Sequence, residues 1–171
     1  KMNSSDFQRG GFSHEESMQV ARMLEGDGLD LLEISGGSYE SQAMFQLSEG
    51  QDSSRQREAY FLEYARDIRA QTSFPLMVTG GSRRVATMRG AIENGACDLV
   101  GLARPLTGEP DLTAQMLAGE SDGARAELRT FGMSGKFDFF SEGGWSSYQI
   151  ARMARGKEPK IDASTAASLL M

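Results

Sequence analysis

The sequence predicts an α/β fold in which parallel strands are covered by helices. Short apolar runs that end in glycine or serine alternate with stretches in which apolar residues recur at helical spacing. The chain has 171 residues, of which 39% are hydrophobic, and this suits one soluble domain with a buried core. Such alternation is typical of a parallel sheet with helices packed outside it.

Four segments have the composition of strands in such a sheet: residues 1–5, 29–35, 76–79 and 98–102. Nearly continuous apolar runs favour parallel strands covered on both faces. Right-handed crossovers would set the four strands side by side, with their carboxyl ends at one edge. Glu33 is the conspicuous polar residue within its apolar run. We expect it to pair with Lys1 of the neighbouring strand, because a buried carboxylate needs a partner.

Helices are expected between these strands. Ser13 followed by Glu16 has the capping-box pattern, and Gly26 is expected to end the helix that follows. Two further helices are marked by apolar stripes, one with Tyr60, Phe61, Tyr64, Ala65 and Ile68 and the other with Val85, Met88 and Ile92. After the last strand, a short helix is expected near residues 112–117, and a final one from Trp145 to Gly156. The long polar segment 38–55 is expected to cover a site.

Charge and cysteine content limit the classes of function. The chain carries 18 Lys and Arg against 24 Asp and Glu, a net charge of −6, so nucleic acid is not an expected partner. No apolar run is long enough for a bilayer, and no signal peptide is evident. Cys97, beside a predicted strand, is expected to be an inert core thiol, and a cytoplasmic protein is expected. With one histidine, His14, expected at the surface, neither a zinc site nor a Ser/His/Asp arrangement can be assembled.

Two neighbouring strand ends form the main candidate site. Gly80 and Gly81 would let a phosphate approach main-chain N–H groups, and Ser82 could cap the next helix. Arg104, after the following strand, could pair with the same phosphate. For each part the alternative is structural: a tight turn for the glycines, and an ion pair at the edge for the arginine. The pairing of two adjacent strand ends favours the phosphate site, which in parallel α/β barrels lies after the last two strands.

Lys1 is the second candidate. A cation at this strand end would stabilise negative charge on a bound cofactor. The alternative is a solvent-exposed terminus, and the residues alone leave both open. Because the first strand begins at Lys1, we expect the chain to be a piece of a longer protein.

Four motifs resemble the Old Yellow Enzyme, or NADH:flavin oxidoreductase, family, and they occur in the family's order: residues 1–7, 32–37, 75–81 and 97–106. The resemblance runs from Lys1 to about Gly119, and the predicted final helix is similar to the family's C-terminal end. It implies an α/β fold that is the C-terminal half, with four βα units and strands five to eight, of an FMN-binding TIM (β/α)8 barrel. It also implies two regions: residues 1–119 as the half-barrel that binds FMN, and residues 120–171 as a C-terminal helix and tail.

The family's cofactor contacts map onto six positions of this sequence. Lys1 matches the basic residue beside the flavin pyrimidine edge. The seventh-strand phosphate turn corresponds to Gly80, Gly81 and Ser82, and the eighth-strand phosphate contact to Ala103 and Arg104. Relatives often have Gly where this chain has Ala103, and many have Phe where it has Ser82. The family's substrate-orienting His residues and its proton-donating Tyr lie upstream of Lys1, so no catalytic residue and no metal ligand is assigned here.

The implied function is part of an FMN-dependent oxidoreductase that takes hydride from NADH or NADPH and passes it to a small-molecule acceptor. This chain alone would be catalytically incomplete. Unpaired edge strands would favour a homo-oligomer or association with a missing N-terminal half, and no nucleic acid or membrane partner is expected. The alternative is a non-catalytic half-barrel scaffold or a domain that binds a phosphate-bearing ligand. A sugar-phosphate enzyme is less favoured, since no paired carboxylate or histidine stands at the strand ends.

Overall fold

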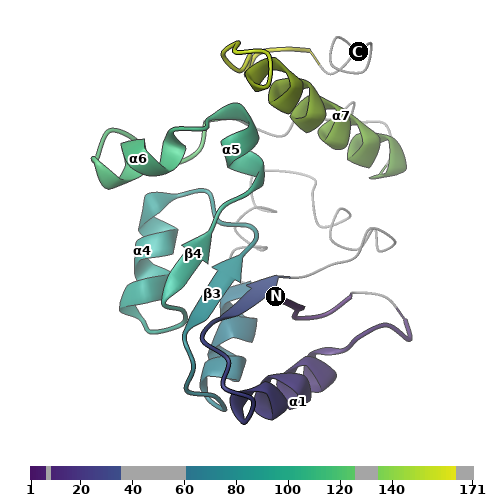
Figure 1. The fold of residues 1–171 in the computed structure, drawn as a ribbon, viewed down its shortest axis with the longest axis vertical. Helices are drawn as coiled ribbons and strands as arrows, with labels where there is room; N and C mark the ends of the chain where they lie inside the picture. The colour runs from purple at the N-terminus through teal and green to yellow at the C-terminus, as the bar shows by residue number, and fades with distance from the viewer. Residues whose placement is uncertain (7–8, 36–60, 126–134, 165–171) are drawn as a thin grey trace. The chain divides into compact units, whose positions relative to one another are not determined.

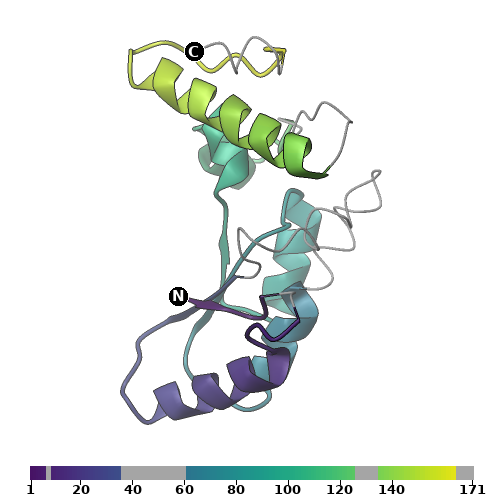
Figure 2. The same ribbon diagram turned by 90° about the vertical axis from the view of Figure 1, so that its right-hand side faces the viewer.

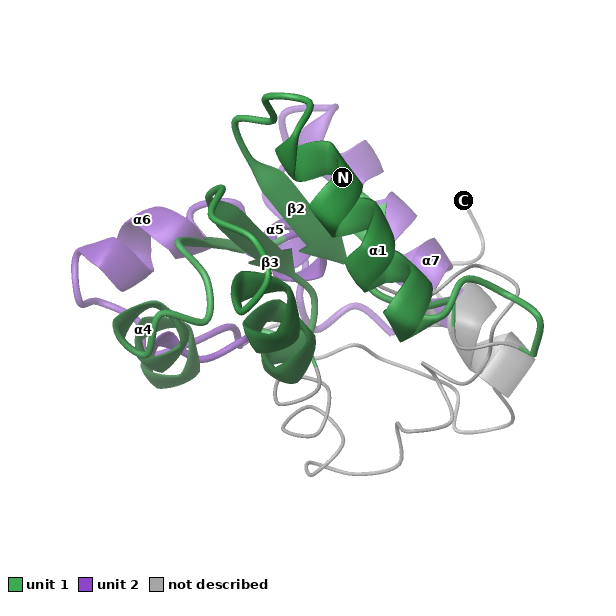
Figure 3. Ribbon diagram, turned by 90° about the horizontal axis from the view of Figure 1, so that it is seen from below, with its two compact units in different colours: residues 1–82, 86–102 green, residues 83–85, 103–171 purple. Residues whose placement is uncertain are grey.

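The computed structural model describes residues 1–6, 9–35, 61–125 and 135–164 of the chain. They belong to two compact units, drawn in different colours in Figure 3. The first unit holds residues 1–82 and 86–102, and the second holds residues 83–85 and 103–171. The division predicted from the sequence, at residue 119, separates a flavin-binding region from a C-terminal tail. The packing of the two units does not test that division, which stays a prediction.

The first unit is built on a four-stranded parallel sheet. The strands are β1 (Met2–Asn3), β2 (Leu32–Ser35), β3 (Leu76–Thr79) and β4 (Leu99–Gly101). Their order in the sheet is β1-β2-β3-β4, and each neighbouring pair is parallel. Figure 1 shows β3 and β4 side by side, pointing the same way. The predicted parallel α/β sheet is therefore confirmed, and all four strands lie inside the predicted segments.

One face of the sheet is covered by helices and forms the core. Along β2 and β3, every second residue is buried: Leu32, Ile34, Leu76 and Val78. These side chains pack with Ala21 of α1 (His14–Glu25), with Phe61, Ala65 and Ile68 of the helical residues 61–69, and with Ala91 of α4 (Val85–Glu93). Figure 3 shows these helices beside β2 and β3. We call this the helix-covered face.

The opposite side of the same strands, which we call the second face, has a different composition. Successive residues of a strand point to opposite faces, so register places on it Asn3, Glu33, Ser35, Met77, Thr79, Leu99 and Gly101. None of these side chains belongs to the buried core cluster formed by the described residues. Leu99 is 47% exposed. The sheet of the first unit is thus apolar on one face and mixed on the other.

Helix α1 begins where the capping box predicts. The hydroxyl of Ser13 accepts a hydrogen bond from the Glu16 main-chain N–H (3.2 Å), and the Glu16 carboxylate accepts one from the Ser13 N–H (2.8 Å). The pair satisfies two N–H groups that a helix start leaves without partners. Gly26 is the C-cap residue, as predicted.

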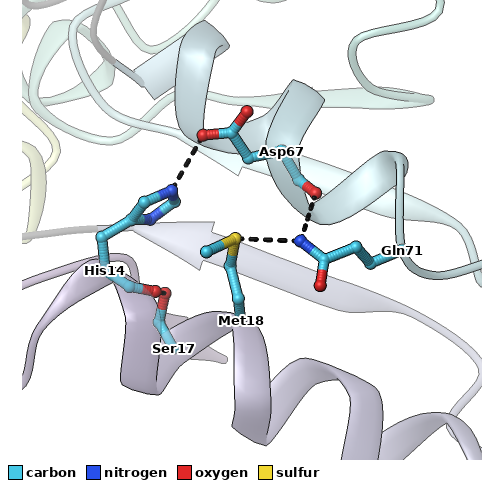
Figure 4. A network of polar contacts seen from close by, with 5 residues as sticks. All are labelled: His14, Ser17, Met18, Asp67 and Gln71. Atoms are coloured by element: carbon cyan, nitrogen blue, oxygen red, sulfur yellow. Dashed lines mark hydrogen bonds and ion pairs between the residues drawn. The ribbon is translucent and has the colours of Figure 1, made fainter.

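His14 joins α1 to the helical residues 61–69, as the close view in Figure 4 shows. Its Nε2 lies 2.9 Å from the Asp67 carboxylate, and its ring meets the Tyr64 ring edge-on at a centroid distance of 3.9 Å. A second link runs from the Gln71 amide to the Met18 sulfur (3.0 Å). His14 is therefore a partly exposed residue at the surface: its side chain is 20% exposed, because the two helices pack across it.

The helices of the second unit are α5 (Arg104–Gly108), α6 (Leu112–Leu117) and α7 (Gly135–Met153). The prediction of α6 is confirmed, whereas α5 was not predicted. Helix α7 starts ten residues before the predicted Trp145, and Figure 2 shows it as one continuous helix. None of the described helices is long and apolar enough to cross a membrane.

Tertiary packing explains why α7 continues through Gly143 and Gly144. Each glycine within a helix costs about 1 kcal/mol relative to alanine. Trp145 and Gln149 on this helix are fully buried. The Gln149 amide also exchanges two hydrogen bonds with the main chain of Lys160, of 2.9 and 2.7 Å. These contacts outweigh the cost of the two glycines. Helix propensity is a local property of the sequence and does not reveal them.

Candidate functional site

The carboxyl ends of β3 and β4 adjoin, as the sequence analysis requires. Thr79 is the register partner of Gly101 in this parallel pair. Gly80 directly follows Thr79, and Leu102 directly follows Gly101, so both strands leave the sheet at the same edge. An arrangement with the two turns at opposite edges, which would have removed the basis for a shared site, is excluded.

The turn after β3 needs glycine for its backbone geometry. Gly80 has φ +135° and Gly81 has φ +73°, a region that side chains other than glycine rarely adopt. A Cβ on Gly80 would also lie 2.9 Å from Cε2 of Phe61. Packing against Phe61 therefore explains Gly80 by itself, which is the structural alternative raised for this glycine.

Ser82 does not cap the next helix, contrary to expectation. Helix α4 begins at Val85, so Arg84 holds the residue position before it. The Val85 N–H donates to the Asp122 carbonyl (2.9 Å), and the Ser82 N–H donates to the Gly80 carbonyl (2.9 Å). The first amide of α4 is thus occupied by main chain. Ser82 itself is buried. It remains part of the turn but not as a helix cap.

Ala103 and Arg104 lie at the start of α5, in the second unit. Ala103 is the N-cap residue, and its carbonyl accepts a hydrogen bond from the Leu106 N–H (3.0 Å). The Arg104 carbonyl accepts one from the Thr107 hydroxyl (2.8 Å). These contacts place both residues at a helix start. Their joint action with Gly80, Gly81 and Ser82 on one phosphate stays a prediction.

Lys1 and Glu33 form the expected ion pair across β1 and β2. Because Met2 pairs with Ile34 in register, Lys1 stands opposite Glu33 on the second face. The hydrogen bond from Lys1 lowers the pKa of Glu33, while partial burial acts in the opposite direction. The Lys1 side chain is 53% exposed and that of Glu33 is 22% exposed. Lys1 is therefore not a free terminus: it is held, but remains open to solvent.

Thr79 also belongs to this site, although nothing in the sequence marks it. It lies diagonally across from Glu33 on the second face, where side chains of neighbouring strands interact. Its hydroxyl helps to lower the pKa of Glu33, but Oγ1 is buried and makes no well-aligned hydrogen bond among the described residues. A threonine in a strand is ordinary, so only the assembled sheet reveals this unsatisfied group.

The loop after β1 is fixed by Asp6. Its carboxylate accepts hydrogen bonds from the Phe12 main-chain N–H (3.0 Å) and the Asn3 amide (3.1 Å). The bond from Phe12 and then that from Asn3 lower the pKa of Asp6. Asp6 and Asn3 thus act as turn formers in this loop.

Cys97 is buried in the core of the first unit, as predicted. Burial raises the pKa of its thiol, and the nearby Asp98 carboxylate acts in the same direction. Raising this pKa disfavours the thiolate, the form that acts as a nucleophile. In the part of the chain that the structure describes, no group of three His, Cys, Asp or Glu residues could hold a metal ion.

Comparison with known proteins identifies the class. The chain is 37% identical over 97 residues to an NADH-dependent flavin oxidoreductase of Talaromyces variabilis. The matched region is 54% of this chain and 23% of that protein. It is 33% identical over 129 residues to an NADH-dependent flavin oxidoreductase of Aspergillus parasiticus, with 72% and 28% coverage. The chain thus spans about a quarter of these two relatives. No protein-family model matches it.

A solved structure of 2-naphthoyl-CoA reductase with 2-naphthoyl-CoA shares the fold, with a TM-score of 0.58 and 24% sequence identity. The matched region is 69% of this chain and 17% of the reductase chain. The described fold and these matches define a parallel α/β segment of the flavin oxidoreductase class. The motif resemblance is confirmed: the chain belongs to the NADH:flavin oxidoreductase, or Old Yellow Enzyme, family.

Proposed function

We propose that this chain is the second half of a (β/α)8 barrel and supplies FMN-binding residues to an NAD(P)H-dependent oxidoreductase. The observation that carries the proposal is the second face, where Lys1, Glu33 and Thr79 occupy adjoining positions beside the Gly80–Gly81 turn. Parallel sheets are covered on both faces in known folds. In a barrel, the second face of this sheet would be covered by the remaining strands.

The residues present fit a flavin on two counts. The Thr79 hydroxyl is buried without a hydrogen-bond partner among the described residues, so a polar ligand edge would satisfy it. The Lys1 side chain is half exposed while Glu33 holds its ammonium, so it can meet an anionic or polar ring edge. When bound, FMN would accept a hydride from NADH or NADPH and deliver it to a small-molecule acceptor.

Each predicted residue then has a role. Lys1 would lie beside the pyrimidine edge and stabilise negative charge there. Gly80 and Gly81 would let the phosphate approach the main chain, since their left-handed backbone carries no side chains there, and Ser82 would complete this turn through its N–H bond to the Gly80 carbonyl. The family resemblance assigns Ala103 and Arg104 to the same phosphate, with Arg104 as a charge-assisted donor.

A titration with FMN and with riboflavin tests the proposal. We expect FMN to bind more tightly, because riboflavin lacks the phosphate. Arg104→Gln should weaken FMN binding about tenfold or more, since a hydrogen bond to a charged group is worth about 1.5–3 kcal/mol. It should leave riboflavin binding unchanged. The matched control is Arg155→Gln, an exposed arginine at the end of α7, which should change neither.

Equal affinity for FMN and riboflavin would contradict the phosphate site. Absence of flavin binding, with the chain folded by circular dichroism, would favour the alternative function, a non-catalytic half-barrel scaffold or phosphate-ligand-binding domain.

We also propose that the chain associates, either with a second copy or with an N-terminal half, and works in the cytoplasm without nucleic acid or membrane partners. The half-exposed Leu99 on the second face supports association. The net charge of −6 supports the absence of a nucleic-acid partner, and the single cysteine supports a cytoplasmic location. Light scattering over a range of concentrations tests self-association, and a monomer at high concentration would contradict it.

A further inference from the structure

We propose that Glu33 is a positioning residue that holds Lys1 in place and weakens the positive field this lysine exerts on a bound flavin. The inference rests on the proposed function, because it needs a flavin beside Lys1. It assigns a role to a carboxylate that the family resemblance does not assign.

The register of the sheet makes the contact specific. Lys1 stands directly opposite Glu33, one residue before the Met2–Ile34 pair, and the ammonium donates a hydrogen bond to Oε1 of Glu33. Directly opposed residues in neighbouring strands have the closest side-chain contact that a sheet offers. Lysine is a flexible chain with four rotatable bonds, so a fixed carboxylate decides where its charge lies.

Burial shows which partner is fixed. The Glu33 side chain is 22% exposed and the Lys1 side chain 53% exposed. Glu33 therefore belongs to the sheet, and Lys1 reaches over it. An isolated carboxylate in this position would be unfavourable. The pairing lowers the pKa of Glu33, so the carboxylate is charged at neutral pH.

Thr79 extends this contact toward the glycine turn. A Cβ at Gly101 would lie 2.0 Å from Oγ1 of Thr79, so the absence of a side chain at Gly101 makes room for the threonine. The buried Oγ1 keeps unused hydrogen-bonding capacity among the described residues. Lys1, Glu33 and Thr79 thus form a polar row across three strands that ends beside Gly80.

The charges predict the direction of the effect. Reduction adds negative charge to the flavin ring, which Lys1 stabilises and Glu33 opposes. Replacing Glu33 with neutral glutamine removes the opposing charge. The variant Glu33→Gln should therefore bind reduced FMN more tightly, relative to oxidised FMN, than the parent chain does.

The test measures the reduction potential of bound FMN against a reference dye. For Glu33→Gln we expect the ratio of oxidised to reduced dissociation constants to rise about tenfold, which is about 30 mV for a two-electron couple. Lys1→Gln should shift the potential in the opposite direction. The matched control is Glu25→Gln: its carboxylate binds Ser73, which precedes β3 and so lies toward the opposite edge of the sheet, and the potential should stay unchanged.

The outcomes separate this inference from the proposed function. If the parent binds FMN and Glu33→Gln has the parent's potential, the positioning role is wrong and the proposed function stands. An equal shift with Glu25→Gln would indicate a general charge effect and would also overturn the role. If the parent does not bind FMN, the proposed function fails, and the role of Glu33 fails with it. Circular dichroism of each variant checks the fold.

Discussion

The two faces of the sheet in the first unit use the same four strands for different purposes. The helix-covered face carries Leu32, Ile34, Leu76 and Val78, each almost fully buried. The second face alternates with them and carries Lys1 opposite Glu33, with Thr79 diagonally beyond. Burial of apolar area is the main source of stability, so the first face determines the fold. The Lys1–Glu33 pair on the second face is partly exposed and contributes little to stability, and the proposed function assigns this face to binding.

Replacing a large side chain with alanine should give the largest difference in stability between the two faces. Ile34→Ala should lower the free energy of unfolding by about 2–5 kcal/mol, because the side chain is fully buried among helices. Met77→Ala on the second face should lower it by about 1 kcal/mol or less, since part of this side chain already contacts water. Urea unfolding of both variants measures the difference. Equal losses would mean that the second face is as much a core as the first.

A substitution in the turn after β3 should have the next largest effect on the free energy of unfolding. Gly80→Ala should cost about 2–4 kcal/mol, because a backbone at φ +135° is strained for alanine and its Cβ would meet Phe61. Gly28→Ala is the control, since Gly28 also has positive φ but nothing within 4 Å, and it should cost only the strain.

Adding Phe61→Leu to Gly80→Ala distinguishes clash from strain. Together they should lose less than the sum of the single losses. Simple additivity would show that Phe61 does not restrict Gly80, and would leave ligand approach as the reason for this glycine.

Crowding on the second face should have a smaller effect. Gly101→Ala should cost about 1–3 kcal/mol, because its Cβ would meet the Thr79 hydroxyl, and Thr79→Ala should restore much of the loss. The control Gly90→Ala, inside α4 with open space around it, should stabilise the chain by up to about 1 kcal/mol. A neutral Gly101→Ala would show that Thr79 moves freely and is not held in the polar row.

The helix-covered face could be predicted from the sequence because its signals are local. The apolar run of residues 76–79 and the Ser13/Glu16 box depend on neighbours in the chain, and the structure confirms the strand and the helix start that they predict. The apolar stripe of α4 was less informative: Ile92 is exposed, and Ala91 is the buried residue of that helix. The large Ile92 side chain suggested the wrong buried face of α4. The helix approaches the sheet closely, so a small side chain such as Ala91 fits between them.

The candidate site was predictable only in part. Glu33 could be paired with Lys1, because a single charge in an apolar strand requires a partner. Thr79 could not be found, since its missing hydrogen-bond partner exists only in the folded sheet. The cap assigned to Ser82 was wrong, because residues 121–124, far along the chain, supply the partner for the first amide of α4.

The smallest expected effect is the pH dependence of the Lys1–Glu33 pair. The folded-state pKa of Glu33 lies below its ordinary value of about 4.3, so its contribution is present above that value and is lost as pH falls through the folded pKa. At pH 7 the parent should be more stable than Glu33→Gln by about 1 kcal/mol or less, because Lys1 is half exposed and screened.

Comparing the parent with Glu33→Gln isolates this contribution. The carboxylates of Asp6 and Asp98 also have lowered pKa values, but they are present in both chains and cancel in the difference. The difference in unfolding free energy should therefore fall as pH drops below about 4.3 and vanish below the folded-state pKa of Glu33, and should shrink in high salt at pH 7. A difference that stays constant across this range would mean that Glu33 acts through its shape and not its charge, and would remove the electrostatic basis for its proposed effect on a flavin.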